Sequence, residues 1–419
     1  MLEAFNKPGN FLSRNGKPNL SDCLLSDIDS AMLPLIKPWD SGHGIMMSYD
    51  STPEIDIHFL AKSYELVNEW REEAGVHPSI KFGEITGGDL SIIVLFLVSF
   101  YLKHVHFASL ASKNFPEILI PQSLTIWGPL EDLKKDLAEY LGMNERVVAN
   151  VFDAIKMKPE DSKHLNNFTS KFMPLIIDLG NGIILKPISS ITRNPFFSII
   201  SLLELRNPYF RNCISNPREE WLRSSLYSLF AGARYHCVSG NIKLSIDNSV
   251  ITDIDAVVYD YLTGELALFQ IKWQDFFFND VKKLRSKASN LIHELDNWAD
   301  KITNWIEINS IEKLSKSLRL KLPKDKSISS IYLFGISKNA ARMQGYGFRI
   351  KTKNLAIANW PQFVRNRFEI GPAERVFHKL YNSLKAQENG SVKTKALPVK
   401  FFISDKIMVF EDLWSTTID

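Results

Sequence analysis

The residues with the clearest chemical potential lie in the segment VITDIDAVVYDYLTGELALFQIKWQ, residues 250–274. Its two apolar runs, joined by a Thr-Gly turn, carry polar side chains that a buried strand normally excludes. Because side chains alternate along a strand, Gln270 and Lys272 lie on one face of the second run. Pairing of the two runs as a hairpin predicts that Asp255 comes close to both of them.

These three residue types suit the hydrolysis of a phosphodiester bond. A carboxylate such as Asp255 holds Mg²⁺, and the side-chain oxygen of Gln270 is a second ligand of the kind that this ion takes. A lysine such as Lys272 orients or activates water and stabilises the charge of the transition state. The alternative is a buried ion pair between Asp255 and Lys272 in an ordinary sheet. Such pairs are costly to bury, so the pattern favours the catalytic interpretation.

The elements that position these residues follow a definite order. Hydrophobic periodicity predicts a helix at residues 217–230, strands at 234–238, 250–259 and 266–273, a helix at 277–306 and a strand at 330–336. In the long helix, apolar residues such as Leu291, Leu295 and Trp298 recur at four- and three-residue steps, which predicts a stripe that packs on the sheet. The predicted order is therefore α-β-β-β-α-β.

The motif and this order resemble the PD-(D/E)xK nuclease superfamily, in its QxK variant. The hallmark of that superfamily is an Asp on one strand and a (D/E)xK or QxK triplet on the next, here Asp255 and Gln270-Ile271-Lys272. The resemblance covers roughly residues 217–337. It implies an α/β, restriction-endonuclease-like core with a mixed sheet, preceded here by a mainly helical N-terminal domain.

The resemblance also implies roles for the motif residues. Asp255 would be the principal Mg²⁺ ligand, with Mn²⁺ as an alternative ion, and the side-chain oxygen of Gln270 and the carbonyl of Ile271 would be further ligands. Lys272 would position the attacking water. Many members have an acid where this chain has Gln270, so a lower metal affinity is expected unless another acid compensates.

Family members often add an acid from the preceding helix, which here means Glu219 or Glu220. Glu219 is preferred because Leu222 and Leu226 follow at +3 and +7 and tie its orientation to the buried stripe. A role for Asp253 is left open.

Length and composition limit the remaining classes. With 419 residues the chain is long enough for two domains, and a net charge of +3 excludes a histone-like binder, so any nucleic-acid surface must be local. Three cysteines without a CxxC pair fit a reducing cytoplasm. The apolar run at residues 90–102 is shorter than the ~20 residues that span a bilayer, so a buried helix and no membrane association are expected.

Residues 1–190 are predicted to form a mainly helical recognition or regulatory domain behind an irregular arm of about 50 residues, and residues 191–419 the nuclease domain. Two short helices around Gly142 and a hairpin turning at Asn181-Gly182 resemble a helix-turn-helix with a wing. Two packed amphipathic helices produce the same pattern, and that interpretation is favoured.

Basic residues gather after the motif, at residues 282–287, 313–326 and 342–353, where phosphate contacts and a solvated face explain them equally well. Trp273 and the following phenylalanines suit stacking on bases, although core packing is the commoner use of such aromatics.

The function expected from the resemblance is a Mg²⁺-dependent endonuclease that cleaves DNA rather than RNA, in prokaryotic defence against foreign DNA. The alternative is a catalytically weak or inactive nuclease-fold protein that binds nucleic acid or serves as a partner-regulated subunit. A protein partner or a homo-oligomer is compatible with either.

Overall fold

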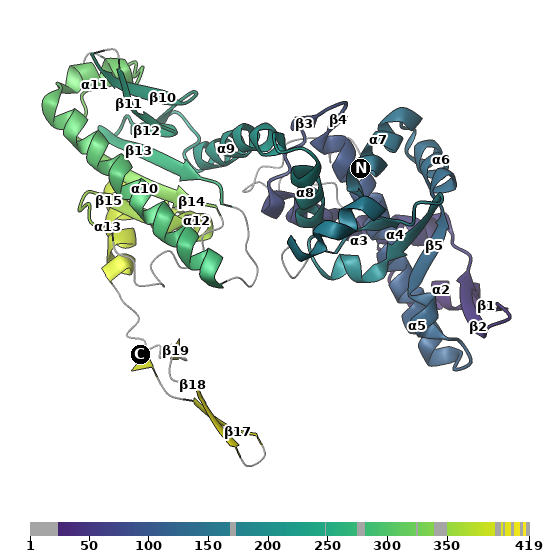
Figure 1. The fold of residues 1–419 in the computed structure, drawn as a ribbon. Helices are drawn as coiled ribbons and strands as arrows, with labels where there is room; N and C mark the ends of the chain where they lie inside the picture. The colour runs from purple at the N-terminus through teal and green to yellow at the C-terminus, as the bar shows by residue number, and fades with distance from the viewer. Residues whose placement is uncertain are drawn as a thin grey trace. The chain divides into compact units, whose positions relative to one another are not determined.

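The computed structural model describes residues 24–167, 173–247, 249–274, 281–323, 326–338 and 350–389, and the backbone of four short strands beyond them. The protein is of mixed α/β class (Figure 1). It divides into two compact units: unit 1 comprises Met1–Ser225 and Asp275–Asn279, and unit 2 comprises Leu226–Gln274 and Asp280–Asp419.

The division falls within helix α9 (Phe210–Ser228), after Ser225, rather than near residue 190 as predicted. Helix α8 (Pro195–Arg206) and the start of α9 bury Phe196, Phe210 and Ile214 in the main core of unit 1. Those apolar side chains make residues 191–225 part of the first unit.

Two long helices form the centre of unit 1. Helix α3 (Pro53–Ala74) is capped by Thr52 and ends at Gly75, whose φ of 69° is readily adopted by glycine. Helix α4 (Gly87–Asn114) begins with a capping box between Thr86 and Asp89. The apolar stretch of α4 is long enough to cross a membrane by length and composition, yet 67% of that window is buried inside the protein. The prediction of a buried helix is confirmed.

The prediction of an irregular N-terminal arm is wrong for residues 24–50. Residues 1–23 lie outside the part of the chain that the structure describes. Helix α2 (Ile28–Met32) leads to a hairpin of β1 (Ile36–Asp40) and β2 (Ile45–Tyr49). Met32 and Met47 are buried in a second apolar cluster with Phe59 and Phe107. This cluster fixes the segment on α3 and α4.

The predicted pair of short helices and the hairpin are confirmed as elements. Helices α6 (Leu130–Leu141) and α7 (Glu145–Ile155) meet at Gly142, which has a φ of 59°. Strands β7 (Ile176–Asp178) and β8 (Ile183–Pro187) form the hairpin, and they lie in a four-stranded sheet of order β5-β8-β7-β6. The other short elements of unit 1 are β3 (Lys81–Phe82), β4 (Ile85–Thr86), α5 (Ile120–Ser123), β5 (Thr125–Pro129), β6 (Lys156–Met157) and 3₁₀ helices at Leu33–Leu35, Pro159–Asn167 and Ile188–Thr192.

Unit 2 contains a five-stranded mixed sheet of order β15-β14-β13-β12-β9. Strand β12 pairs antiparallel with both β9 and β13, whereas β13, β14 and β15 run parallel. The strands are β9 (Tyr235–Val238), β12 (Ala256–Asp260), β13 (Glu265–Lys272), β14 (Ser330–Ser337) and β15 (Leu355–Asn359).

The predicted strand at residues 250–259 is two strands separated by a bend at Asp255. The first, β11 (Ser249–Ile254), pairs with β10 (Ile242–Ile246) in a separate hairpin, and the second is β12. The order of elements remains helix, strands, helix, strand, with the β10-β11 hairpin inserted.

Helices cover both faces of the sheet. Helix α10 (Val281–Ile308) covers one face (Figure 1), and its Leu291 and Leu295 belong to the same buried cluster as Val257 and Leu268 of the sheet, which confirms the predicted stripe. On the other face, the ring of Phe363 from α12 (Trp360–Ile370) packs edge-on against two stacked phenylalanines of the sheet. Helix α13 (Val376–Asn389) lies beside α12, and α11 (Ile311–Ser317) follows α10.

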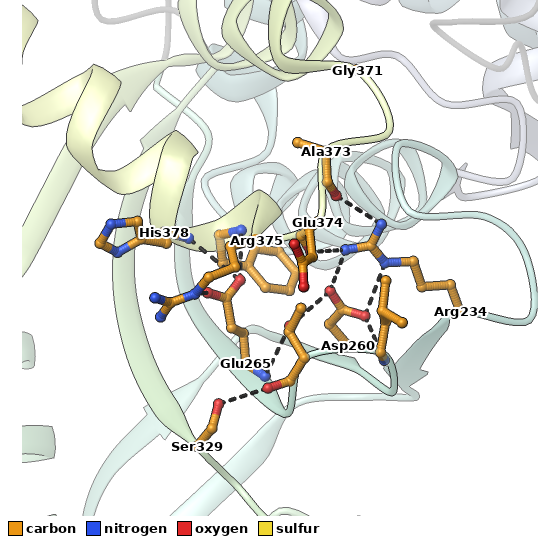
Figure 2. Close-up of polar contacts among 12 residues, drawn as sticks. Arg234, Asp260, Glu265, Ser329, Gly371, Ala373, Glu374, Arg375 and His378 are labelled. Carbon is orange, nitrogen blue, oxygen red and sulfur yellow. Dashed lines mark hydrogen bonds and ion pairs between the residues drawn. The ribbon is translucent and has the colours of Figure 1, made fainter.

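Two ion pairs between an arginine and a buried acid, Arg234–Asp260 and Arg375–Glu265, lie at the β12-β13 end of the sheet and are called the arginine clamp (Figure 2). The carboxylate of Asp260 is fully buried and accepts hydrogen bonds from Nε and Nη2 of Arg234 at 2.9 and 2.6 Å. The same carboxylate accepts from the Leu262 N–H and the Thr263 hydroxyl. Arg234 also donates to the carbonyls of Ala373 and Glu374, so it ties the turn to the segment that precedes α13.

Glu265 completes this end of the sheet. Its buried carboxylate accepts from Arg375 Nε at 3.0 Å and from the Phe377 N–H at 3.1 Å. Glu265 therefore caps the N-terminus of α13 from a neighbouring strand.

Near the C-terminus, β17 (Val399–Ile403) and β18 (Lys406–Phe410) form an antiparallel hairpin. This hairpin forms a separate two-stranded sheet, as does the pair β16 (Lys395–Ala396) and β19 (Trp414–Ser415).

Candidate functional site

Asp255 lies at the bend between β11 and β12 and is only 3% exposed. Its N–H donates at 3.0 Å to the carbonyl of Phe269, the residue that pairs with Ala256 at the end of the β12-β13 ladder. Because Ala256 pairs with Phe269, Asp255 comes opposite Gln270 on the neighbouring strand. The bend ends the pairing with β10 and begins the pairing with β13 at this residue.

The side chains of Asp255 and Gln270 meet across the two strands. Oδ2 of Asp255 accepts from Nε2 of Gln270 at 2.5 Å and from the backbone N–H of Ile271 at 2.7 Å. Gln270 is 3% exposed, so both polar groups are buried and satisfied together. The predicted approach of these two motif residues is confirmed.

Lys272 follows Gln270 by two residues on β13, so alternation places its side chain on the same face. It is half-buried, and its backbone pairs with Ser337 of the parallel strand β14. That the ammonium group of Lys272 lies beside the carboxylate of Asp255 stays a prediction.

The backbone of Ile271 points its polar groups toward β12. On that side the carbonyl of Phe269 accepts from the N–H of Asp255. Two residues further along the strand, the N–H of Ile271 donates to the carboxylate of Asp255. The N–H and the carbonyl of one strand residue leave the strand on the same side, so the Ile271 carbonyl lies on the Asp255 side of β13.

The candidate helix acids stand differently. Glu219 is half-buried on the part of α9 that belongs to unit 1, whereas Asp255 belongs to unit 2. A role of Glu219 as a metal ligand therefore stays a prediction. Glu220 is exposed and forms an ion pair with Arg223 at 2.5 Å. Asp253 accepts from the Asn241 side chain at 3.1 Å within the β10-β11 hairpin.

The oxygen atoms at this end of the hairpin are of the types that bind a hard divalent cation. They are the carboxylate of Asp255, the amide of Gln270 and the carbonyl of Ile271, and Mg²⁺ accepts such a set because it keeps several of its waters. Gln270 turns its amide nitrogen toward Asp255. A half-turn of the amide would present its oxygen instead. Within the described ranges, no group of three or more His, Cys, Asp and Glu side chains is arranged to hold a metal.

The buried acids of the arginine clamp are poor ligands by comparison. Both oxygens of Asp260 are taken up by Arg234 and by groups of the turn, and both oxygens of Glu265 accept from Arg375 or from α13. These carboxylates therefore serve the fold.

Sequence reasoning missed Lys338, which lies at the same edge of the sheet. Its N–H donates to the Lys272 carbonyl at 3.0 Å, and its Nζ lies 5.7 Å from the centre of the Trp273 ring. The available signal was a lysine directly after a strand that runs parallel to the motif strand.

The predicted basic groups are described only in part. Arg285, Lys287, Lys313, Lys351 and Lys353 are exposed. The side chains of Lys282, Lys283, Lys324, Arg342 and Arg349 lie outside the described residues.

The α6-α7 pair carries mainly acidic groups. The exposed acidic residues are Glu131, Asp132, Asp136, Glu139, Glu145 and Asp153. Arg146, on the helix that would read DNA, is paired with Glu84 at 2.5 Å, and Asn150 donates to the same carboxylate. Since a phosphate backbone requires positive charge, these charges favour the packed-helix interpretation over a DNA-reading one.

Compared with protein-family models, with curated proteins and with solved structures, the chain matches none of them.

Proposed function

We propose that unit 2 is a metal-dependent nuclease of the PD-(D/E)xK type that hydrolyses phosphodiester bonds. The observation that carries the proposal is the convergence of Asp255 with Gln270 and Ile271 at the end of the β12-β13 hairpin. In this proposal the acid, the amide and the backbone carbonyl of the bent strand and the QxK triplet form one small polar site.

The topology supports the same proposal. Helix α9 is followed by the antiparallel strands β9, β12 and β13, and α10 then leads to β14, which is parallel to β13. This order is similar to the α-β-β-β-α-β order of the restriction-endonuclease-like core, with β10-β11 as an insertion, β15 as an extension and most of α9 belonging to unit 1.

In this proposal Asp255, the amide oxygen of Gln270 and the Ile271 carbonyl hold Mg²⁺ or Mn²⁺, with Glu219 as an additional ligand. The ion supplies Lewis-acid activation and charge stabilisation when bound. Lys272, on the same face as Gln270, orients the attacking water and offsets the negative charge of the transition state.

The substrate and setting follow from the resemblance. DNA is favoured over RNA because DNA cleavage predominates in the superfamily, and the proposed role is defence against foreign DNA in a prokaryotic cytoplasm. Unit 1 then recognises a protein partner or a second copy of the chain, because its α6-α7 surface lacks the charge to hold DNA.

One observation favours a second candidate, an inactive nuclease-fold protein that binds nucleic acid. The Asp255 oxygen that would face a metal accepts two internal N–H donors, one of them from the residue that replaces the usual acid. A carboxylate stabilised in this way needs no cation.

Incubation of the full chain with supercoiled plasmid and Mg²⁺ or Mn²⁺ tests the proposal. Nicked or linear product is expected from the wild type and from Lys379→Ala, an exposed lysine at the start of α13 and thus at the Glu265 end of the sheet. Asp255→Asn should form no product. Equal cleavage by Asp255→Asn and the wild type would refute the assignment. Calorimetry that detects no binding of either ion, together with no cleavage, would favour the second candidate.

A further inference from the structure

Two tryptophans of helix α10 hold the β10-β11 hairpin by its backbone. The indole N–H of Trp298 donates to the carbonyl of Asp253 in β11 at 2.7 Å, and that of Trp305 donates to the carbonyl of Ser245 in β10 at 3.1 Å. The two tryptophans are seven residues apart, about two helical turns, so they lie on one face of α10. Both are almost fully buried, with 5% and 1% of their surface exposed. Each strand of the hairpin is therefore fixed to the helix.

The bond from Trp298 lies immediately before the bend that carries Asp255. Asp253 is the penultimate residue of β11, and Ile254 is the last residue that pairs with β10. At the next residue, the N–H of Asp255 already donates to the Phe269 carbonyl of β13. The Asp253 carbonyl thus comes where the chain changes its pairing partner, and a carbonyl inside the protein needs a donor. Trp298 supplies that donor.

This anchor bears on the position of the Asp255 carboxylate. Its Oδ2 accepts from the Gln270 amide at 2.5 Å and from the Ile271 N–H at 2.7 Å, and both distances depend on where the bend places the Asp255 backbone. After the bend the backbone is held by the pairing of β12 with β13, and before it by Trp298. Metal ligands must be held within about 0.5 Å by neighbours of this kind. We infer that Trp298 is a positioning residue, which holds the Asp255 carboxylate in place for the metal.

The inference deepens the proposed function and rests on it, because it takes Asp255 as a metal ligand. Residues that orient metal ligands without touching the ion typically contribute about 10–100-fold to metal affinity or activity. Trp305 provides the contrast within the same helix. Its acceptor Ser245 pairs with Val250, five residues before Asp255 and therefore about 16 Å away along an extended strand. Loss of the Trp305 N–H should leave the Asp255 carboxylate in place.

The matched variants Trp298→Phe and Trp305→Phe of the full chain test the inference. Each loses one indole N–H and keeps an aromatic ring in the core, so both should lower the melting temperature to a similar extent. Plasmid cleavage is then measured against Mg²⁺ concentration. Trp298→Phe should need about 10–100-fold more Mg²⁺ for its half-maximal rate, and saturating Mg²⁺ should restore most of the wild-type rate. Trp305→Phe should keep the wild-type requirement. A purely structural role of Trp298 would lower the melting temperature without raising the Mg²⁺ requirement.

Hydrogen exchange of the Ile271 amide gives a readout that needs neither metal nor turnover. This N–H donates to Oδ2 of Asp255, so displacement of the carboxylate should speed its exchange. NMR of Trp298→Phe should show faster exchange at Ile271 relative to the amides of strand β14, and Trp305→Phe should show no such difference. General destabilisation of unit 2 would speed exchange at both places. Should Trp298→Phe fail to fold, benzothienylalanine at position 298, which has sulfur in place of the indole N–H, removes the donor and keeps the shape.

The outcomes separate the inference from the proposed function. If the wild type cleaves plasmid but Trp298→Phe and Trp305→Phe have equal Mg²⁺ requirements, or if Ile271 exchanges equally fast in both, the inference falls and the proposed function stands. If the wild type neither cleaves nor binds Mg²⁺ or Mn²⁺, the proposed function falls and the metal role of Trp298 falls with it. Faster exchange at Ile271 in Trp298→Phe alone would then assign Trp298 to holding the bend of an inactive fold.

Discussion

The side-chain amide of Gln270 donates a hydrogen bond to Oδ2 of Asp255 across strands β12 and β13, and the following backbone N–H, that of Ile271, donates to the same atom. Two donors stabilise the ionised carboxylate inside the protein. The same arrangement makes Gln270 the residue that best distinguishes a metal site from a purely structural one.

Replacing Gln270 by Glu puts a second carboxylate beside Asp255. Without metal, two acids at this distance repel each other, so the melting temperature of Gln270→Glu should lie below that of the wild type. Mg²⁺ should then stabilise the variant more than the wild type, and an ion at 100 times the variant's dissociation constant stabilises that variant by about 2.7 kcal/mol in total. Gln270→Ala should show a smaller response to Mg²⁺ than the wild type. Identical responses of the two variants in differential scanning calorimetry would exclude Gln270 from a metal site.

Replacing Lys272 by Ala should affect turnover far more than metal binding. The metal ligands remain, but an oriented cation is lost, and removal of one such electrostatic stabiliser lowers rates by on the order of 10²–10³. Single-turnover plasmid cleavage measures the loss, and calorimetric Mg²⁺ titration should give an affinity close to that of the wild type. A variant that cleaves at the wild-type rate would show that Lys272 has no part in the chemistry.

The arginine clamp should be important for the stability of unit 2. Arg234→Met leaves the fully buried Asp260 without its partner, and breaking a buried pair costs about 3–5 kcal/mol. Arg365→Met is the control, because its ion pair with Glu369 is exposed and its N–O distance is long, at 4.0 Å. The free energy of unfolding of this variant should therefore stay within about 0.5 kcal/mol of the wild-type value. Urea unfolding followed by circular dichroism compares them. Equal midpoints for the two variants would contradict the role of the clamp.

His104 should make unit 1 less stable in mild acid. Its Nε2–H donates to the Ser123 carbonyl at 2.6 Å, and in the neutral ring Nδ1 accepts from the Tyr49 hydroxyl at 2.9 Å. Burial lowers the pKa of His104, opposed by the bond to Ser123 and assisted by Lys186 and Lys103. Below the unfolded pKa of about 6.5, the unfolded chain binds a proton that the native state excludes, so stability falls as the pH decreases from that value toward the lowered pKa.

The check is the decrease in melting temperature between pH 7.5 and 5.5. His104→Gln should show a smaller decrease than the wild type. Some decrease should persist, because burial also lowers the pKa of His58 and His77 in the same unit. An unchanged decrease in the variant would mean that His104 does not couple folding to pH.

The sequence by itself determined the local features of this protein. Alternation along the motif strands correctly placed Asp255 and Gln270 on facing positions, and the stripe through Leu291 and Leu295 correctly identified the face of α10 that packs on the sheet. Such patterns repeat every two residues in a strand and every 3.6 in a helix, so they can be read within one segment.

The tertiary structure decided what depends on distant partners. Phe210 and Ile214 are apolar in any context, and only their burial in the main core of unit 1 assigns them to that unit, in which the chain continues to residue 225. The bend at Asp255 exists because β11 and β12 pair with different strands. In the arginine clamp, Arg234 and Asp260 are 26 residues apart in the sequence, and Glu265 and Arg375 are 110 residues apart. Lys338 lies beside Trp273 only because β14 runs parallel to β13. Pairing and burial over such separations depend on the folded chain as a whole, and no local periodicity encodes them.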